Sequence, residues 1–503
     1  MLARLGWPVV VLEGHSEPGG CASTFYRRGF RFDAGATVAA GFAPGQPLEV
    51  LGRFLGLSWH AHHEPLAMQV HLPDGTVINR WTDRRRWREE RRALFGERGE
   101  AFWRWQERTA AWLQVFASHR PPWPLEGPKD AIRLGQALGA AWGKGLSPRW
   151  LLEALRDAGR PVAHRLPPGD SRLRLLVEGQ VWISAQAPAG QANALYSAAA
   201  LDLPHMGVAW LPGGIGTIAH QLARAVVRLG GAVYYRQEVV RVRPLEEGGF
   251  SVQVRGGRSW EAEAVIFNMP PGSALQRIEG VPVRAAGPTS LVPPDGWGAF
   301  TVYATVRDTA IPDDVPLHHQ VLLGEPLGEG NSIFLSISPR GDLTRSPQGF
   351  RVITMSTHTA LAPWWVLFHT DRAAYAARKA EYISRLLEGG TLVFPRLKEG
   401  MVWVEAGTPV TFWRFTRRPL GWVGGFPQTR IGRFAPSRLG KGLYLVGDAI
   451  FPGQSLPAVV LGAWRVAEEV AVWLATRSVR RRGHVMAEVH RCLPASQEAI
   501  PND

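Results

Sequence analysis

The sequence predicts an α/β protein of two interleaved lobes, one of which contains a parallel, Rossmann-like sheet. Two segments at opposite ends of the chain support this fold class. Residues 8–12 form a short apolar run that ends in Glu13. Residues 443–446 form a second apolar run that ends in Gly447-Asp448, and a turn and an apolar helical pattern to about residue 475 follow. Strands that end in an acid or a glycine before a helix are typical of nucleotide-binding α/β folds.

The C-terminal segment favours a bound flavin. Gly447 lets the backbone approach a cofactor, and Asp448 can bind a ribityl or phosphate-linked hydroxyl. The helix that follows offers free N–H groups and a positive dipole, and Gly453 in the intervening turn is assigned to the same site. The alternative is an ordinary strand–turn–helix unit of an α/β protein.

The N-terminal segment supplies the other expected cofactor contacts. We expect Glu13 to bind the adenosine ribose, and Gly19 and Gly20 to lie on the pyrophosphate side. The acid usually follows the first glycine of the phosphate loop by about 20 residues. Glu13 is twelve residues from Met1. We therefore expect the first strand and the phosphate loop to lie upstream of residue 1, as they would if the start codon were assigned too late. The alternative is a fold that needs no such loop.

The residue patterns between the two ends predict both helices and strands. A hairpin is expected at residues 68–80 with Asp74-Gly75 in its turn, and helices are expected through 83–165 and 170–200. Residues 213–216 resemble a phosphate loop only in composition, and we interpret them as the start of a helix near the cofactor. The predicted flavin-binding lobe comprises residues 1–80, 205–285 and 396–478, the predicted substrate and membrane-facing lobe comprises 81–204 and 286–395, and 479–503 form a frayed tail.

The composition limits the class of protein and its possible location in the cell. The chain has 503 residues, of which 45% are hydrophobic and 20% charged, as in globular proteins. Two cysteines, Cys21 and Cys492, form no disulfide framework, and no metal site is expected. No apolar run reaches the length of about 18 residues that a membrane-spanning helix needs. We expect a cytoplasmic protein that is peripherally associated with the inner face of the cell membrane.

The net charge and the tryptophan content indicate which kinds of partner the protein could bind. The net charge of +14 fits attraction to anionic lipid headgroups, and it also fits an ordinary solvated surface. No nucleic-acid partner is expected, because no binding motif accompanies the charge. Tryptophans among the arginines of residues 81–150 favour either the membrane–water interface or the core of a helical lobe. These tryptophans are Trp81, Trp87, Trp103, Trp105, Trp112, Trp123, Trp142 and Trp150.

The motifs, taken in order, resemble the phytoene-desaturase superfamily of flavin amine-oxidase-like proteins, which includes carotenoid desaturases, carotenoid isomerases and retinol saturases. The matching segments are residues 9–13, 19–21, 30–35, 212–214, 265–268 and 442–453. The resemblance covers nearly the whole chain. It implies an amine-oxidase-like fold with an α+β substrate lobe, FAD as cofactor and a lipophilic carotenoid as substrate.

A narrower resemblance concerns the reaction. Residues 317–320, 331–338, 407–409 and 421–425 look like carotenoid 3,4-desaturases, whereas residues 451–455 are closer to carotenoid isomerases. The first resemblance implies a C-3,4 double bond introduced into a 1-hydroxy acyclic or monocyclic carotenoid. The alternatives are a phytoene desaturase, a carotenoid cis/trans isomerase and a carotenoid-binding scaffold without turnover. The electron acceptor stays open.

His318 and His319 are the candidate catalytic residues. The flavin accepts the hydride in a desaturation, so the protein needs little acid–base machinery. One histidine could accept the proton or bind the substrate hydroxyl. Neighbouring side chains on a strand point to opposite faces, so only one ring is expected to face the site. The alternative is a pair of histidines with a structural role.

Overall fold

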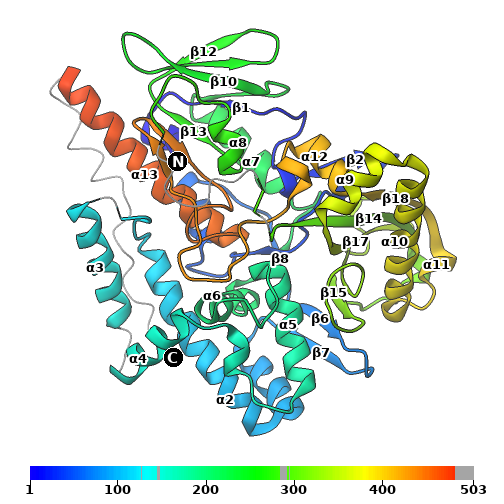
Figure 1. Ribbon diagram of the computed structural model, residues 1–503. Coiled ribbons are helices and arrows are strands. Elements are labelled where there is room, and N and C mark those ends of the chain that lie inside the picture. The colour runs from blue at the N-terminus through cyan, green and yellow to red at the C-terminus, as the bar shows by residue number, and fades with distance from the viewer. Residues whose placement is uncertain (126, 144–147, 284–291, 294, 482–503) are drawn as a thin grey trace.

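The computed structural model describes residues 1–125, 127–143, 148–283, 292–293 and 295–481. Figure 1 shows small sheets and the long helix α13 (Leu456–Arg481) in its upper part. Helices α2 to α6 lie below them, and a large sheet covered by α9 to α11 lies to the right. Within the described ranges, no helix combines the length and the apolar character needed to cross a bilayer.

Parallel strands occur where the sequence predicts them. Strand β1 (Val10–Leu12) pairs in parallel with β9 (Ala232–Tyr234). Strand β13 (Val265–Phe267) pairs in parallel with β20 (Leu443–Leu445), and β19 (Arg438–Gly440) lies antiparallel on the other edge of β20. In the described part of the chain, β1 and β13 belong to separate sheets. The α/β fold class is confirmed, with its parallel strands in two groups.

The large sheet has seven strands in the order β18-β14-β17-β16-β15-β6-β7, and only β15 and β6 pair in parallel. Its predicted hairpin is confirmed, because the Asp74 carboxylate accepts the Thr76 N–H at 3.0 Å in the turn. The strands are β6 (Leu66–His71), β7 (Val77–Trp81), β14 (Trp297–Arg307), β15 (His318–Leu322), β16 (Ser332–Ile337), β17 (Phe350–Ala360) and β18 (Met401–Gly407).

This sheet crosses the lobe boundaries expected from the sequence. Strands β6 and β18 come from segments assigned to the flavin lobe, yet they pair with β15 and β14, which belong to segments assigned to the substrate lobe. Hydrogen bonding between strands distant in sequence cannot be read from local patterns, because each strand pattern only shows that some partner exists. The division into lobes stays a prediction.

The helical segments also lie where they are expected. Residues 84–118, 128–142 and 148–158 form α2, α3 and α4, and the predicted helix pair is α5 (Ser171–Ala185) and α6 (Ala194–Ala200). Residues 482–503 of the predicted frayed tail lie outside the described residues. The other helices are α1 (Pro47–Leu55), α7 (Thr217–Arg228), α8 (Pro271–Leu275), α9 (Leu361–Thr370), α10 (Arg372–Val393), α11 (Leu397–Gly400) and α12 (Pro409–Thr416).

The smaller strands complete the fold around these elements. A hairpin of β2 (Thr24–Arg27) and β3 (Phe30–Asp33) follows β1. A three-stranded antiparallel sheet contains β10 (Val239–Pro244), β11 (Phe250–Val254) and β12 (Ser259–Ala262). A further small sheet contains β4 (Ala39–Ala40), β8 (Val208–Trp210) and β5 (His62–His63). These strands connect the parallel groups to the rest of the chain.

Half of the eight tryptophans of residues 81–150 are buried in the core of the helical region. Trp87 and Trp103 are fully buried and contact each other edge to face at 5.0 Å. The guanidinium of Arg80 lies 3.9 Å from the ring centre of Trp87, a cation–π contact. Trp105 and Trp150 are also buried, whereas Trp142 is exposed. The core interpretation therefore holds for these four buried tryptophans.

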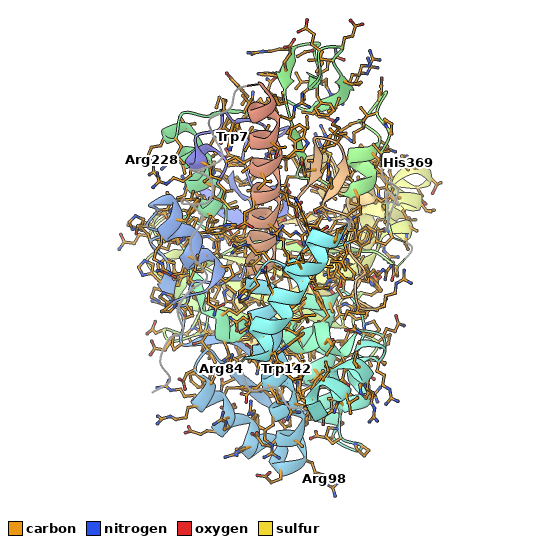
Figure 2. The ribbon with its side chains drawn as sticks, turned by 90° about the vertical axis from the view of Figure 1, so that its left-hand side faces the viewer. Trp7, Arg84, Arg98, Trp142, Arg228 and His369 are labelled. Carbon is orange, nitrogen blue, oxygen red and sulfur yellow. The ribbon has the colours of Figure 1, made fainter. Side chains whose placement is uncertain are left out.

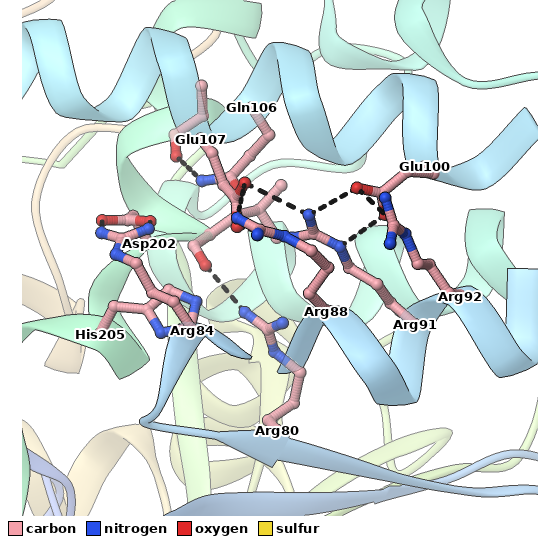
Figure 3. Close-up of polar contacts among 12 residues, drawn as sticks. Arg80, Arg84, Arg88, Arg91, Arg92, Glu100, Gln106, Glu107, Asp202 and His205 are labelled. Carbon is pink, nitrogen blue, oxygen red and sulfur yellow. Dashed lines mark hydrogen bonds and ion pairs between the residues drawn. The ribbon is translucent and has the colours of Figure 1, made fainter. Parts of the chain in front are cut away.

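A buried ionic cluster fixes the two halves of α2 against each other. The backbone of Gly96 (φ 59°, ψ −165°) interrupts the helix, so its halves lie side by side (Figure 3). Arg91 is fully buried before this break and donates to Glu100 at 2.8 and 3.0 Å and to Glu107 at 2.7 and 3.2 Å after it. Charges removed from water need such complete pairing, because an unpaired buried ion is costly.

We predict that Arg91→Ala lowers the free energy of urea unfolding by about 3–5 kcal/mol, because it leaves the buried Glu100 without its main partner. Arg92 is a matched control, since it is half-exposed and lies 3.9 Å from the same carboxylate. Arg92→Ala should cost about 1 kcal/mol or less. Equal losses for the two variants would contradict a role for burial.

Candidate functional site

A pocket of about 530 Å³ lies where chain segments leave the parallel strands. Glu238 follows β9, and Ser273 follows β13 in helix α8. Ligands of open α/β sheets bind at the carboxyl ends of the strands, which matches this position. Helix α12 and the turn after it form another wall. The lining residues are Glu238, Arg255, Ser273, Gln276, Arg277, Trp413, Arg417 and Pro419.

Arginine dominates the charge of this pocket. Arg255 donates to Glu238 at 3.1 and 3.2 Å, and this contact lowers the pKa of the Glu238 carboxyl. Arg417 lies 3.5 Å from the same carboxylate. Arg277 is held by the carbonyls of Val239 and Ser273 at 2.9 and 2.7 Å. Three arginines against one glutamate fit a phosphate-containing ligand, because guanidinium groups bind phosphate oxygens in pairs.

Glu13 lies beside this pocket. Its backbone continues the pairing of β1 with β9, because its N–H donates to the Tyr234 carbonyl at 2.8 Å. Its carboxylate accepts the His15 N–H at 2.8 Å and is half-buried. A Cβ on Gly14, the next residue, would lie 3.7 Å from Glu238. The structure thus places Glu13 at a strand end where it can meet the hydroxyls of a nucleotide, and its assignment to the ribose stays a prediction.

Gly447 and Asp448 follow β20 at the corresponding strand end. Gly447 has φ +113°, and a side chain there would meet the Asn268 amide oxygen at 2.9 Å. The backbone is therefore held in a conformation that favours glycine and leaves space beside it. Asp448 pairs with Arg418 at 3.0 Å, and Arg418 also donates to the Trp422 carbonyl at 2.6 Å. A carboxylate held in this way is oriented, and it keeps lone pairs for a ligand hydroxyl.

Gly19 and Gly20 come from the other end of the chain and reach the same region. Gly19 precedes a short 3-10 turn (Gly20–Ala22) between β1 and β2, and Gly20 is its first residue. Burial raises the pKa of the adjacent Cys21 thiol. The charge of Arg418 lowers this pKa, and the charge of Asp448 raises it. These charges act on the thiol only because the segments are close in space. The fold therefore brings together cofactor-binding candidates that are more than 400 residues apart in the sequence.

Gly453 lies at the junction with the helical region. A Cβ there would meet the Tyr196 hydroxyl at 2.9 Å. The neighbouring Gln454 donates to the Ile183 carbonyl at 3.2 Å and accepts the Gly425 N–H at 3.1 Å. Gly453 therefore packs against the partly buried Tyr196 before α13 begins, and its assignment to the cofactor stays a prediction.

Residues 213–216 form the helix start that the sequence indicates. Helix α7 begins at Thr217. A Cβ on Gly214 would lie 2.4 Å from the Asp33 carboxylate, so this glycine allows the turn to approach the end of β3. Asp33 is buried. It accepts hydrogen bonds from Thr24 at 2.7 Å and from the Ile215 N–H at 2.9 Å, and it forms an ion pair with Arg345 at 2.9 Å.

The two candidate histidines have different surroundings on β15. His319 Nε2 lies 2.9 Å from the Pro316 carbonyl, and its Nδ1 lies 3.2 Å from His71 Nε2. Both of its ring nitrogens are therefore engaged by the protein. His318 Nδ1 lies 2.8 Å from Ser336 Oγ, whereas its buried Nε2 has no partner among the described residues. Burial lowers the pKa of His318 to about 4 and that of His319 to about 3, so both are neutral near pH 7.

His318 lines a second, small cavity of about 30 Å³. The Ser336 hydroxyl donates to Thr37 Oγ1 at 2.7 Å. Its single hydrogen is then used, so His318 Nδ1 carries the hydrogen that it shares with Ser336, and Nε2 is an acceptor. Asp33 and Arg345 line the same cavity and pair with each other, whereas the buried Nε2 of His318 has no partner among the described residues.

Sequence reasoning missed several residues of these sites. Arg255, Arg277, Arg417 and Arg418 were indistinguishable from the many other arginines of the chain. Each becomes part of a site only through contacts made across the fold. Asp33 was noted within a motif, but its bond to Arg345 joins segments that no local pattern links.

Comparison with known proteins gives a consistent result. The family model for flavin containing amine oxidoreductase matches residues 1–471. The chain is 27% identical to prolycopene isomerase 1 of an Oncidium hybrid cultivar over 492 residues, which cover 94% of this chain and 81% of the relative. It is 25% identical to the hydroxyneurosporene desaturase of Cereibacter sphaeroides over 510 residues, which cover 95% of each.

Solved structures share the fold. An oxidoreductase from Methanosarcina mazei superposes with a TM-score of 0.56 at 15% identity, covering 93% of this chain and 96% of the other. Putrescine oxidase bound to putrescine superposes with a TM-score of 0.53 at 15% identity, covering 95% of each chain. The amine-oxidase-like fold and the FAD cofactor expected from the motifs are confirmed. The chain belongs to the family of flavin containing amine oxidoreductases.

Proposed function

We propose that the protein is a FAD-dependent carotenoid desaturase that introduces a C-3,4 double bond into a 1-hydroxy acyclic or monocyclic carotenoid. Support for the carotenoid class comes from the relatives, which include desaturases and isomerases of these compounds. Support for the hydroxylated substrate comes from the motifs around β15 and β16 and from the surroundings of His318.

The unpartnered Nε2 of His318 is the observation that carries the proposal. A 1-hydroxy carotenoid is a hydrocarbon with one hydroxyl at its end. A buried acceptor that lacks a partner favours a ligand which brings one donor to it, because an unsatisfied buried polar atom is costly. The Ser336–Thr37 hydroxyl chain holds the ring in the tautomer that accepts. His318 would therefore orient the substrate through its hydroxyl group.

The remaining chemistry requires little of the protein. When bound, FAD supplies the hydride acceptor. The three pocket arginines and the Arg418–Asp448 pair would hold this cofactor through its phosphates and hydroxyls. His318 is neutral, so the lone pair of its Nε2 is available to accept a hydrogen bond from the substrate hydroxyl. Asp33 is fully engaged by Arg345, Thr24 and Ile215, and it acts as a fixed support.

A redox-neutral cis/trans isomerase is the second candidate. The similarity to prolycopene isomerases and the sequence of residues 451–455 favour it. Both activities use the same fold, cofactor and class of substrate, so the reaction product must distinguish them.

The expected product is a carotenoid with one more conjugated double bond. The protein, supplied with FAD, is incubated with a 1-hydroxy carotenoid and with the same carotenoid lacking the hydroxyl. Separation by chromatography with mass and absorption detection should show the loss of two hydrogen atoms and a red shift, preferentially for the hydroxylated compound. A product of unchanged mass but altered cis/trans ratio would instead identify the isomerase. No change in either pigment would favour a binding scaffold.

Replacing His318 should reduce the preference for the hydroxylated substrate. His318→Leu removes the acceptor, and we expect the ratio of kcat/KM for the two substrates to fall by an amount equivalent to about 1–3 kcal/mol, the value of one buried hydrogen bond. His318→Gln is the matched control, because it retains an acceptor and should keep part of the preference. An unchanged ratio in His318→Leu, with the protein folded, would rule out this contact.

A further inference from the structure

Helix α3 exposes large apolar side chains and turns small alanines and Arg133 toward the rest of the protein. Ile132 is 63% exposed and Trp142 is 47% exposed, and both lie on the outward side of the helix. Gly135 and Gly139 lie on the same face. The opposite face contains the buried Ala137 and Ala141 together with Arg133, which lies 3.8 Å from Glu468 of α13. A surface helix of a globular protein normally shows the reverse arrangement.

Helix α4 repeats this inverted arrangement. Leu152 and Leu155 are 68% and 65% exposed, and Leu151 is also exposed. The inward face contains the acids. Asp157 is fully buried and accepts hydrogen bonds from Trp105 at 2.9 Å and from Arg165 at 2.9 and 2.7 Å. The leucines of α4 therefore face outward, and its two acids face inward.

The two helices lie at one edge of the molecule in Figure 1, and Figure 2 looks onto that edge with Trp142 labelled. We call the outward residues Ile132, Leu138, Trp142, Leu151, Leu152 and Leu155 the α3–α4 surface. Concentrated exposed apolar side chains mark a site of interaction with a partner or a membrane. Basic residues accompany them, because Lys129, Arg156 and Arg160 are exposed, whereas Glu153 turns inward and binds Arg108 at 2.9 Å.

We propose that the α3–α4 surface docks onto an anionic lipid bilayer. The apolar side chains would enter the boundary between headgroups and acyl chains, where tryptophan is also favoured. The exposed basic residues and the net charge of +14 complement anionic headgroups. A second copy of the chain is a poorer occupant, because a two-fold contact through this surface would bring its basic residues close to the same residues of the partner.

This surface also gives the proposed activity a source of substrate, and to that extent the inference rests on the proposed function. A lipophilic carotenoid resides in the bilayer, so docking would bring the protein to it. Docking depends only on the exposed apolar side chains and the basic residues of the α3–α4 surface, so it can be tested without any substrate.

The test is flotation of the full-length protein with vesicles of phosphatidylcholine alone or mixed with phosphatidylglycerol. The variant combines Ile132→Gln, Trp142→Gln, Leu152→Gln and Leu155→Gln, which are all exposed positions. The matched control combines Leu343→Gln and Val366→Gln, which are 69% and 58% exposed on other parts of the molecule. Circular dichroism and thermal unfolding check that both variants fold.

We expect the unmodified protein and the control to float with the anionic vesicles, more weakly at high salt. The four-site variant should partition at least about tenfold more weakly, because several large apolar side chains no longer enter the lipid. Flotation of the variant equal to that of the unmodified protein would overturn the proposal. The proposal would also be overturned if the unmodified protein did not float. It would be overturned as well if the unmodified protein and the control formed a dimer that the four-site variant did not form.

Turnover of detergent-dispersed carotenoid separates this proposal from the proposed function. The four-site variant should retain turnover, since its substitutions lie on the outer surface. Flotation without any carotenoid turnover would support docking and refute the proposed reaction. Turnover without flotation would support the proposed reaction and refute docking.

Discussion

The buried carboxylate of Asp33 joins three parts of the chain that are far apart in sequence. In the β2–β3 hairpin it accepts a hydrogen bond from Thr24, it accepts another from the turn before α7, and it forms an ion pair with Arg345 in the segment between β16 and β17. A buried charge is stable only with such complete pairing, and loss of any partner would leave it exposed to a large desolvation cost. This requirement fixes the β2–β3 hairpin against α7 and against the large sheet. The cavity beside His318 has its shape because these segments cannot move apart.

The Arg418–Asp448 pair has a comparable effect on the nucleotide side. It fixes the strand end after β20 against the turn after α12, and Arg418 is held in place by the carbonyl of Trp422. The glycines near Cys21 reach this pair from the other end of the chain. The polar groups that position a cofactor are thus supported by partners from distant segments, which is how a site keeps its geometry without a ligand.

Polarity is distributed unusually in the helical region. Its interior contains a paired ionic cluster between the halves of α2, and α4 turns Glu153 and Asp157 inward and three leucines outward. The inward charges are satisfied by ion pairs and hydrogen bonds, so the core tolerates them. The outward apolar residues have no such explanation within the described chain, and the proposed docking onto a lipid surface would account for them.

The sequence alone determined the local elements and the family. Strand ends at Glu13 and Gly447, the Asp74-Gly75 hairpin and the long helices follow from short-range patterns, because hydrophobic period and turn residues act locally. It also showed that His318 and His319 face opposite ways, since strand geometry requires it. Only the tertiary structure decided which of the two faces a cavity, which arginines line the nucleotide pocket, and that β6 and β18 join the large sheet. Helical spacing likewise shows that Leu152 and Leu155 share a face, but only packing decides that this face points outward.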